Sequence, residues 1–179
     1  MENCIEKVLL TEDQIQARIR ELGEELSREY ADKDPVFVGV LKGVVVFYAD
    51  MVRRITVPCQ FDFMWISSYS GTESTCKMEV KRDISADIKG RHVVILEDIF
   101  DTGNSLQYTY EHLLKKEPAS LKICTLLDKP ERRVKPIASD YCGFTIPDAF
   151  VVGYGLDYAE RYRNLPYVGI LKPSVYGGE

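Results

Sequence analysis

The fold of this chain is decided by residues 91–106, which have the sequence RHVVILEDIFDTGNSL. Four consecutive apolar residues, 93–96, are mostly β-branched and predict a strand buried on both faces, as in a parallel sheet. Two carboxylates, Glu97 and Asp98, follow where that strand is expected to end. The loop 101–105 combines a glycine for a tight turn with side chains that cap helix N-termini, so it predicts the beginning of a helix.

A strand, a small-residue loop and a helix N-terminus in this order form an anion site, because unpaired backbone N–H groups and the helix dipole converge there. The adjacent carboxylates would repel a bare phosphate, so the ligand should also carry hydroxyl groups, as a sugar phosphate does, or bring a divalent cation such as Mg²⁺. The loop is neither a Walker A sequence nor the GxGxxG of dinucleotide folds. The ordinary alternative is a capped helix after a buried strand, with acids that face solvent, but the complete ordered run favours the anion site.

Length and composition indicate a single domain, residues 1–179. The chain is 45% hydrophobic, which is enough for one substantial core. Its net charge is −5 and no basic stripe is present, so neither nucleic acid nor an anionic membrane is an expected partner. The acidic residues 1–6 show no signal peptide, the apolar stretch 44–49 is too short to span a bilayer, and the cysteines form no CxxC pair, so we expect a reducing, cytoplasmic location.

Strands and helices alternate along the chain, which favours a parallel α/β sheet. Apolar runs predict strands at 36–41, 61–66, 121–127, 149–153 and 167–171. Amphipathic spacing predicts helices at 11–30, where Thr11 and Gln14 have capping-box spacing, and at 44–54. Residues 67–82 are polar with almost no apolar periodicity, so a loop that is either functional or disordered is expected there.

Several of the apolar runs end directly in polar or charged residues. The groups that follow in this way are, in chain order, Lys42-Gly43, Glu97-Asp98, Asp128-Lys129 and, after a loop, Asp157. Ligands of open α/β sheets bind at the carboxyl ends of the strands. If these strands are parallel, the groups meet at one edge of the sheet and form a binding site there.

Residues 97–105 resemble the phosphoribosyl-diphosphate signature of the type I phosphoribosyltransferases, and nearly the whole chain resembles the bacterial hypoxanthine/guanine members of that family. The further matches are Leu41-Lys42-Gly43, Ser68-Tyr69, Leu127-Asp128-Lys129, and Phe150 to Tyr158 with Arg163. The resemblance implies the type I phosphoribosyltransferase fold, an α/β fold with a central parallel sheet flanked by helices and a small hood. The N-terminal segment and parts of 120–179 would form the hood, and residues 67–82 a flexible lid.

The resemblance also implies an enzyme of purine salvage. Such an enzyme transfers the 5-phosphoribosyl group from phosphoribosyl diphosphate to N9 of hypoxanthine, and of guanine, and yields IMP or GMP and pyrophosphate. Mg²⁺ would be the cofactor, and the assembly would be a homodimer or homotetramer. Two rivals remain: an RNA-binding regulator of the same fold, which the lack of a basic stripe does not favour, and an enzyme of this fold that uses another base. The segment around Lys129 and Phe150 argues against adenine, whereas xanthine stays open.

By the same resemblance, the signature residues bind the donor. The loop residues that would cradle the 5′-phosphate are Thr102, Gly103, Asn104 and Ser105. Asp101 would act as general base near N7 or N9 of the purine. Glu97 and Asp98 would bind the ribose hydroxyls, directly or through Mg²⁺, and Asp157 would join them in the metal site.

The pyrophosphate would be bound by two other matches. Lys42 and Gly43 would form a loop that in the family contains a cis peptide bond between the residues matching Leu41 and Lys42. Arg163 would bind the leaving pyrophosphate, because its planar fork matches phosphate oxygens. The ordinary alternatives are a solvated turn at 42–43 and a surface ion pair between Arg163 and a nearby acid.

The purine would be bound by three residues in the second half of the chain. Phe150 would stack on the purine face, the backbone of Val151 would contact the ring edge, and Lys129 would donate to the 6-oxo group. Ser68 and Tyr69 would open the lid that folds over the site and excludes water. The ordinary alternatives are a core position for Phe150 and a loop start at Lys129.

Overall fold

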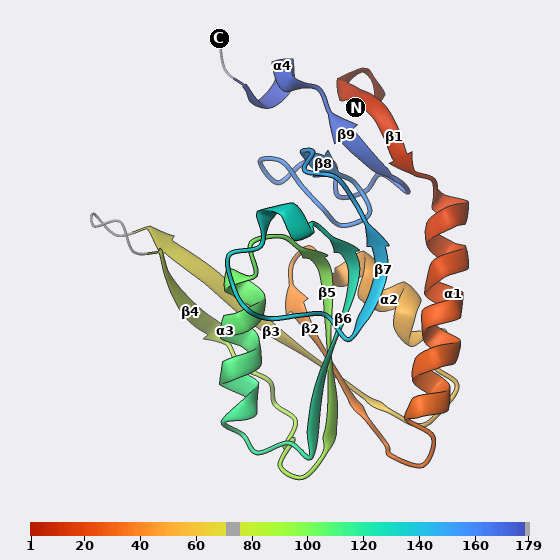
Figure 1. Ribbon diagram of the computed structural model, residues 1–179, viewed down its shortest axis with the longest axis vertical. Helices are drawn as coiled ribbons and strands as arrows, with labels where there is room; N and C mark the ends of the chain where they lie inside the picture. The colour runs from red at the N-terminus through yellow and green to blue at the C-terminus, as the bar shows by residue number, and fades with distance from the viewer. Residues whose placement is uncertain (71–75, 178–179) are drawn as a thin grey trace.

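Six strands form the main sheet of this protein, whose structure, a computed structural model, describes residues 1–70 and 76–177 (Figure 1). In order across the sheet they are β4 (Cys76–Arg82), β3 (Gln60–Ser70), β2 (Val36–Leu41), β5 (His92–Phe100), β6 (Ser120–Asp128) and β7 (Tyr141–Thr145). Neighbouring strands are parallel except β3 and β4, which are antiparallel. The predicted α/β fold with a central parallel sheet is therefore confirmed.

Helices cover both faces of this sheet. The helices α1 (Glu12–Glu29) and α2 (Val45–Val52) pack on one face together with Val94 and Leu96 of β5. The helix α3 (Asn104–Leu114) packs on the other face together with Val93 and Ile95. All four β5 residues are completely buried, so the predicted two-sided burial of this strand is confirmed.

The first helix begins as its sequence predicts. Thr11 is the N-cap, its side-chain oxygen accepts from the N–H of Gln14, and the Gln14 side chain accepts from the N–H of Thr11, which completes a capping box. Its apolar stripe is fully buried and consists of Ile15, Ile19, Leu22 and Leu26.

A second, smaller sheet lies at the upper end of the main sheet in Figure 1. It contains β1 (Ile5–Leu10), β9 (Val168–Leu171) and β8 (Val151–Val152) in that order, all antiparallel. Three short helices complete the described structure: η1 (Glu2–Cys4), η2 (Pro130–Arg132) and α4 (Pro173–Tyr176). The strands of the small sheet come from the segments for which a hood is expected, and the division of the chain into one domain with a hood stays a prediction.

The end of β5 differs from the sequence prediction. The strand does not stop at Leu96, because its parallel pairing with β6 continues to Phe100. Glu97 and Asp98 therefore lie inside the strand, whereas the sequence predicts them just after its end. Backbone pairing across the sheet outweighs the tendency of two adjacent carboxylates to end a strand.

The apolar runs at 149–153 and 167–171 do not join the parallel sheet. They supply β8 and β9, which pair with each other in the small sheet, and β9 also pairs with β1. The polar segment that follows β3 differs as well: β3 continues to Ser70, and residues 76–82 form β4 beside it. Residues 71–75 lie outside the described residues, so mobility of the lid at 67–82 stays a prediction.

No helix within the described ranges is long and apolar enough to cross a membrane. The cysteines whose side chains are described are free thiols, namely Cys4, Cys59, Cys124 and Cys142.

Candidate active site

A cavity of about 380 Å³ lies where the carboxyl ends of β2, β5 and β6 face the segment that follows β8. Its lining comes from both sides, and consists of Lys42, Gly43, Asp98, Ile99, Asp101, Lys129, Arg132, Phe150, Val151, Leu156, Asp157 and Arg163. A smaller cavity of about 70 Å³ shares Ile99 and Asp101 with it and reaches the loop between β5 and α3. Of the polar groups predicted to meet here, all but Asp128 line one of the two cavities, and Asp128 pairs with Arg133 instead.

The loop between β5 and α3 surrounds the smaller cavity. The cavity is lined by residues of the signature run, including Glu97, Asp101, Thr102, Gly103 and Ser105. Gly103 is the N-cap of α3 and has a φ of 86°, in the left-handed region. A Cβ at this position would come within 3.1 Å of the Phe100 ring, so the tight turn needs glycine. Asn104 begins α3 and lines neither cavity, and its side chain is exposed.

Glu97 and Asp98 are two adjacent buried carboxylates, each only 9% exposed. Oε2 of Glu97 has no hydrogen-bond partner among the described residues. Burial, together with the neighbouring Asp98 charge, raises the pKa of Glu97 well above its ordinary value. Burial also raises the pKa of Asp98 to about 6, although its own backbone contacts and the Arg163 charge oppose that rise. Both raised pKa values show that the charged form of the pair is disfavoured by burial, and that a cation or hydroxyl donors would stabilise it.

The loop at Lys42 and Gly43 lies directly against this carboxylate pair. The peptide bond between Leu41 and Lys42 is cis, as the resemblance implies. A Cβ on Gly43 would lie 1.9 Å from Oδ2 of Asp98, so only glycine fits. A Cβ on Gly155 would lie 2.1 Å from the carbonyl oxygen of Gly43, so the loop after β8 packs onto the same glycine from the other side.

Arg163 contacts several other residues of the segment that follows β8. Its Nη1 donates to the carbonyl of Gly155 at 2.8 Å, and its Nη2 lies 2.8 Å from Oδ1 of Asp157. Glu160 lies between the cations, with Oε2 at 3.5 Å from Arg163 and 3.2 Å from Nζ of Lys42. These pairs bring Lys42, Asp157 and Arg163 to one wall of the cavity, and the exposed pairs with Glu160 contribute little stability.

Asp101 and Lys129 also line the cavity. Nε of Arg132 is 3.1 Å from Oδ1 of Asp101. Lys129 is only 4% exposed, its Nζ donates to the carbonyl of Ala149 at 2.5 Å, and burial lowers the pKa of its ammonium. The Lys129 ammonium retains further N–H donors for a ligand because one carbonyl satisfies only one of three.

The residues predicted to bind the base, Lys129, Phe150 and Val151, all line this cavity. The two residues predicted to open the lid cannot be located in the same way. Val151 is buried in β8, and Phe150 precedes it with an exposed ring, so it does not occupy a core position. The side chains of Ser68 and Tyr69 lie outside the described part of the chain, so their roles stay predictions.

Three residues that line the larger cavity were missed by the sequence analysis: Ile99, Arg132 and Leu156. A longer β5 would have indicated Ile99, because it follows Asp98 in the same strand. The charge of Arg132, three residues after Lys129, was the available signal for its place at the cavity. No pattern in the sequence singles out Leu156.

The donor atoms of the site suit a hard cation only in part. Among the described residues, no group of three or more His, Cys, Asp or Glu side chains is close enough to hold a metal ion alone. The unpartnered Oε2 of Glu97 and the raised pKa values of the carboxylate pair fit the oxygen ligands that Mg²⁺ prefers. Mg²⁺ usually binds through one or two carboxylates plus substrate phosphates, so the residues fit a shared site and not a complete protein cage.

Comparison with known proteins gives consistent matches over most of the chain. The family described as "Phosphoribosyl transferase domain" matches residues 8–159. The hypoxanthine-guanine phosphoribosyltransferase of Streptococcus pneumoniae is 51% identical over 177 residues, 98% of each chain. A crystal structure of a hypoxanthine phosphoribosyltransferase from Staphylococcus aureus is 49% identical, has a TM-score of 0.95 and covers 99% of this chain and 97% of its own. A Trypanosoma cruzi hypoxanthine phosphoribosyltransferase in complex with the product IMP is 40% identical, with a TM-score of 0.91 and 97% coverage of each chain.

Proposed function

This chain belongs to the phosphoribosyltransferase family, and from this we propose that its adjoining cavities hold the two substrates of purine salvage. The enzyme transfers the 5-phosphoribosyl group from phosphoribosyl diphosphate to N9 of hypoxanthine and of guanine, releasing pyrophosphate. The observation that carries this function is the junction of the anion loop 101–105 with the cavity that contains Lys129 and Phe150.

The donor lies along the edge formed by β2 and β5. Its 5′-phosphate occupies the smaller cavity, where the N–H groups of Thr102, Gly103, Asn104 and Ser105 and the N-terminus of α3 receive it. Its ribose hydroxyls donate to Glu97 and Asp98, whose burial makes such partners favourable. Its diphosphate extends toward Gly43 and the cations of Lys42 and Arg163, the latter offering a planar fork.

The base occupies the wall formed by Lys129, Phe150 and Val151. The Lys129 ammonium donates to the 6-oxo group, the ring of Phe150 stacks on one purine face, and the backbone of Val151 contacts the ring edge. Asp101 reaches the imidazole side of the base from the loop that holds the phosphate.

The reaction forms the bond between purine N9 and C1 of the ribose and breaks the bond between C1 and the pyrophosphate oxygen. The bonding electrons leave with pyrophosphate, and the purine proton passes to the carboxylate of Asp101. Positive charge that develops at C1 is stabilised by Glu97 and Asp98 beneath the ribose. Lys42 and Arg163 hold the leaving group in line.

Mg²⁺ would be held by Glu97 and Asp98, or by Asp157, in each case together with substrate oxygens, and would neutralise charge on the departing pyrophosphate. We therefore expect excess chelator to lower the rate of IMP formation about 10²-fold, with Mg²⁺ or Mn²⁺ restoring it. Initial rates against free metal concentration test this. Nucleotide formation at an unchanged rate in chelator would remove the metal role of the three carboxylates.

Gly43→Ala tests the pyrophosphate loop. The added methyl would meet the Asp98 carboxylate at 1.9 Å, so either the loop or this carboxylate must be displaced. A displacement of this size should lower kcat/KM for phosphoribosyl diphosphate about 10²-fold. Gly90→Ala is the control, since its Cβ meets no atom within 4 Å while its positive φ adds backbone strain of its own. A Gly43→Ala enzyme that matches the Gly90→Ala enzyme would contradict the assignment of this loop.

The expected lid, the assembly as homodimer or homotetramer and the cytoplasmic location stay predictions alongside this function. The experiment that tests the function itself is a panel of free bases, namely hypoxanthine, guanine, xanthine and adenine, each assayed with phosphoribosyl diphosphate and Mg²⁺. Nucleotide formation from hypoxanthine and guanine is the expected result. A protein that ribosylates none of the four bases would overturn the proposal.

A further inference from the structure

The ring of Phe150 contacts two tyrosine rings of the same chain. It is 37% exposed and lines the larger cavity. The ring of Tyr176, from α4, stacks on it with centroids 4.7 Å apart and planes inclined by 20°. Tyr176 is not among the residues that line the cavity, and α4 lies beyond β8 and β9, away from the main sheet (Figure 1). Tyr176 therefore covers the face of Phe150 that is turned away from the cavity.

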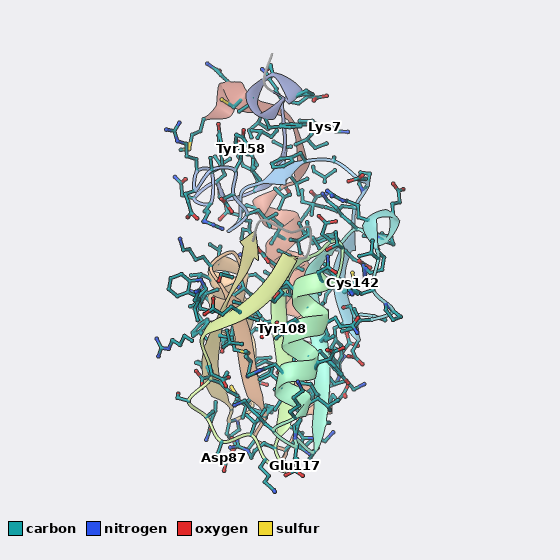
Figure 2. The ribbon with its side chains drawn as sticks, turned by 90° about the vertical axis from the view of Figure 1, so that its left-hand side faces the viewer. Lys7, Asp87, Tyr108, Glu117, Cys142 and Tyr158 are labelled. Carbon is teal, nitrogen blue, oxygen red and sulfur yellow. The ribbon has the colours of Figure 1, made fainter. Side chains whose placement is uncertain are left out.

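A second tyrosine contacts the edge of the same ring. Tyr158 meets Phe150 in a T-shaped arrangement, with centroids 5.6 Å apart and planes inclined by 87°. Figure 2 shows Tyr158 beside the small sheet. Because Tyr158 follows Asp157 directly, the aromatic cluster of Phe150, Tyr158 and Tyr176 also connects the base wall to the segment that carries Asp157 and Arg163.

The backbone of Phe150 is held, but its ring depends on these neighbours. Its carbonyl accepts from the N–H of Leu171 at 2.9 Å, which fixes the main chain against β9. That bond does not restrict the side-chain torsions, and an exposed aromatic ring can adopt other rotamers when its neighbours are removed. Tyr176 and Tyr158 restrict those torsions by occupying the back face and the edge of the ring.

The position of Tyr176 is itself built into the fold. The helix α4 has four residues and is too short to be stable alone. It is anchored by Lys172, whose N–H donates to the carbonyl of Cys4 at 2.9 Å and whose Nζ donates to that of Asn3 at 2.7 Å. Val175 packs into the apolar core of the small sheet. These contacts hold α4 in the position from which the Tyr176 ring stacks on Phe150.

We propose that Tyr176 is a positioning residue for the purine: it holds the Phe150 ring in the plane in which its other face stacks on the base. This inference rests on the proposed function, because it needs a purine on that face. An aromatic pair of this geometry stabilises by an amount that corresponds to a roughly 3- to 10-fold change in binding. Losing Tyr176 should therefore affect the base and not the phosphoribosyl group.

The test uses the full chain with four substitutions. Tyr176→Ala removes the ring, Tyr176→Leu keeps apolar bulk without a ring to stack, and Tyr176→Phe keeps the ring. Tyr108→Ala is the matched control, because Tyr108 lies on α3 and stacks on His112, away from the small sheet (Figure 2). For each variant we would measure kcat, the KM values for hypoxanthine and phosphoribosyl diphosphate, and the Kd values of IMP and of ribose 5-phosphate, which lacks the base.

In Tyr176→Ala and Tyr176→Leu, the KM for hypoxanthine and the Kd of IMP should rise about 3- to 10-fold. The KM for the donor and the Kd of ribose 5-phosphate should stay within about twofold, as should every value for Tyr176→Phe and Tyr108→Ala. An unchanged KM for hypoxanthine in Tyr176→Ala and Tyr176→Leu would overturn the proposal. So would equal weakening of IMP and ribose 5-phosphate, since that indicates general loss of structure. If the wild-type protein forms no IMP, it is the proposed function that fails.

Discussion

Asp101→Asn is expected to lower kcat about 10²- to 10⁴-fold while the affinity for phosphoribosyl diphosphate changes far less. The amide has nearly the size of the carboxylate but cannot take the purine proton. The loop should keep its position, because the backbone carbonyl of Asp101 accepts from Nε of Arg133 at 3.2 Å and that contact does not involve the side chain. Steady-state kinetics with hypoxanthine over a range of pH, together with the Kd of the donor, measure both effects.

The matched control for this variant is Asp148→Asn. Asp148 also faces Arg132, at 3.9 Å from its Nη1, but its side chain is about half exposed and does not line either cavity. It should retain wild-type kcat to within about twofold. If Asp101→Asn retains near-native kcat at every pH, Asp101 is only part of the loop structure and another group carries the proton.

The second large effect concerns the choice of base. Hypoxanthine and guanine should be used, and adenine should be rejected by roughly 10⁴-fold in kcat/KM. A 6-oxopurine offers an acceptor to the Lys129 ammonium, whereas adenine presents an amino donor at that position. Lys129 is buried and bonded to the carbonyl of Ala149, so its ammonium cannot turn to water when the wrong base is bound.

Lys129→Ala removes the group that makes this distinction. It should lower kcat/KM for hypoxanthine and narrow the gap to adenine, because the unpaired charge is gone. Lys89→Ala is the control, since Lys89 is exposed and paired with Glu117 at 2.6 Å. Equal use of adenine and hypoxanthine by the wild-type protein would show that the role of Lys129, and with it the 6-oxopurine class, is wrong.

The parts of the fold that are visible in the sequence are those with strong local patterns. The two-sided burial of residues 93–96 and the capping box at Thr11 depend on neighbours in the chain, and both are confirmed. The run 149–153 was placed in the wrong sheet, because an apolar run does not specify which strand it pairs with. The strand β7 was missed because it is short and contains Gly143, whose lack of a Cβ lets the carbonyl of Leu126 approach.

The site is predictable from the sequence only where its residues are neighbours in the chain. The loop 101–105 and the carboxylate pair lie within one continuous run, so their proximity follows from the chain itself. Phe150 and Arg163 reach the same cavity because of the small sheet. That sheet forms only through pairing of strands that are far apart in the sequence. Arg132 was missed because its contact with Asp101 crosses between two strand ends, and no spacing in the sequence encodes that distance.

The packing of Gly155 against Gly43 has a consequence for how this enzyme could be altered. Donor recognition is assigned mainly to the main sheet, and most of base recognition to the segment carried by the small sheet, with a glycine-to-glycine backbone contact between them. No side chain is needed at that contact, so changes at 151–152 do not disturb it, whereas a change at Phe150 also removes the packing against Tyr158 and Tyr176. Acceptor choice is therefore separated from donor binding at this backbone contact, and coupled to it only where the Phe150 ring meets Tyr158. A combinatorial library confined to residues 151–152 and Lys129 would explore new nucleobases while it preserves the phosphoribosyl half of the site.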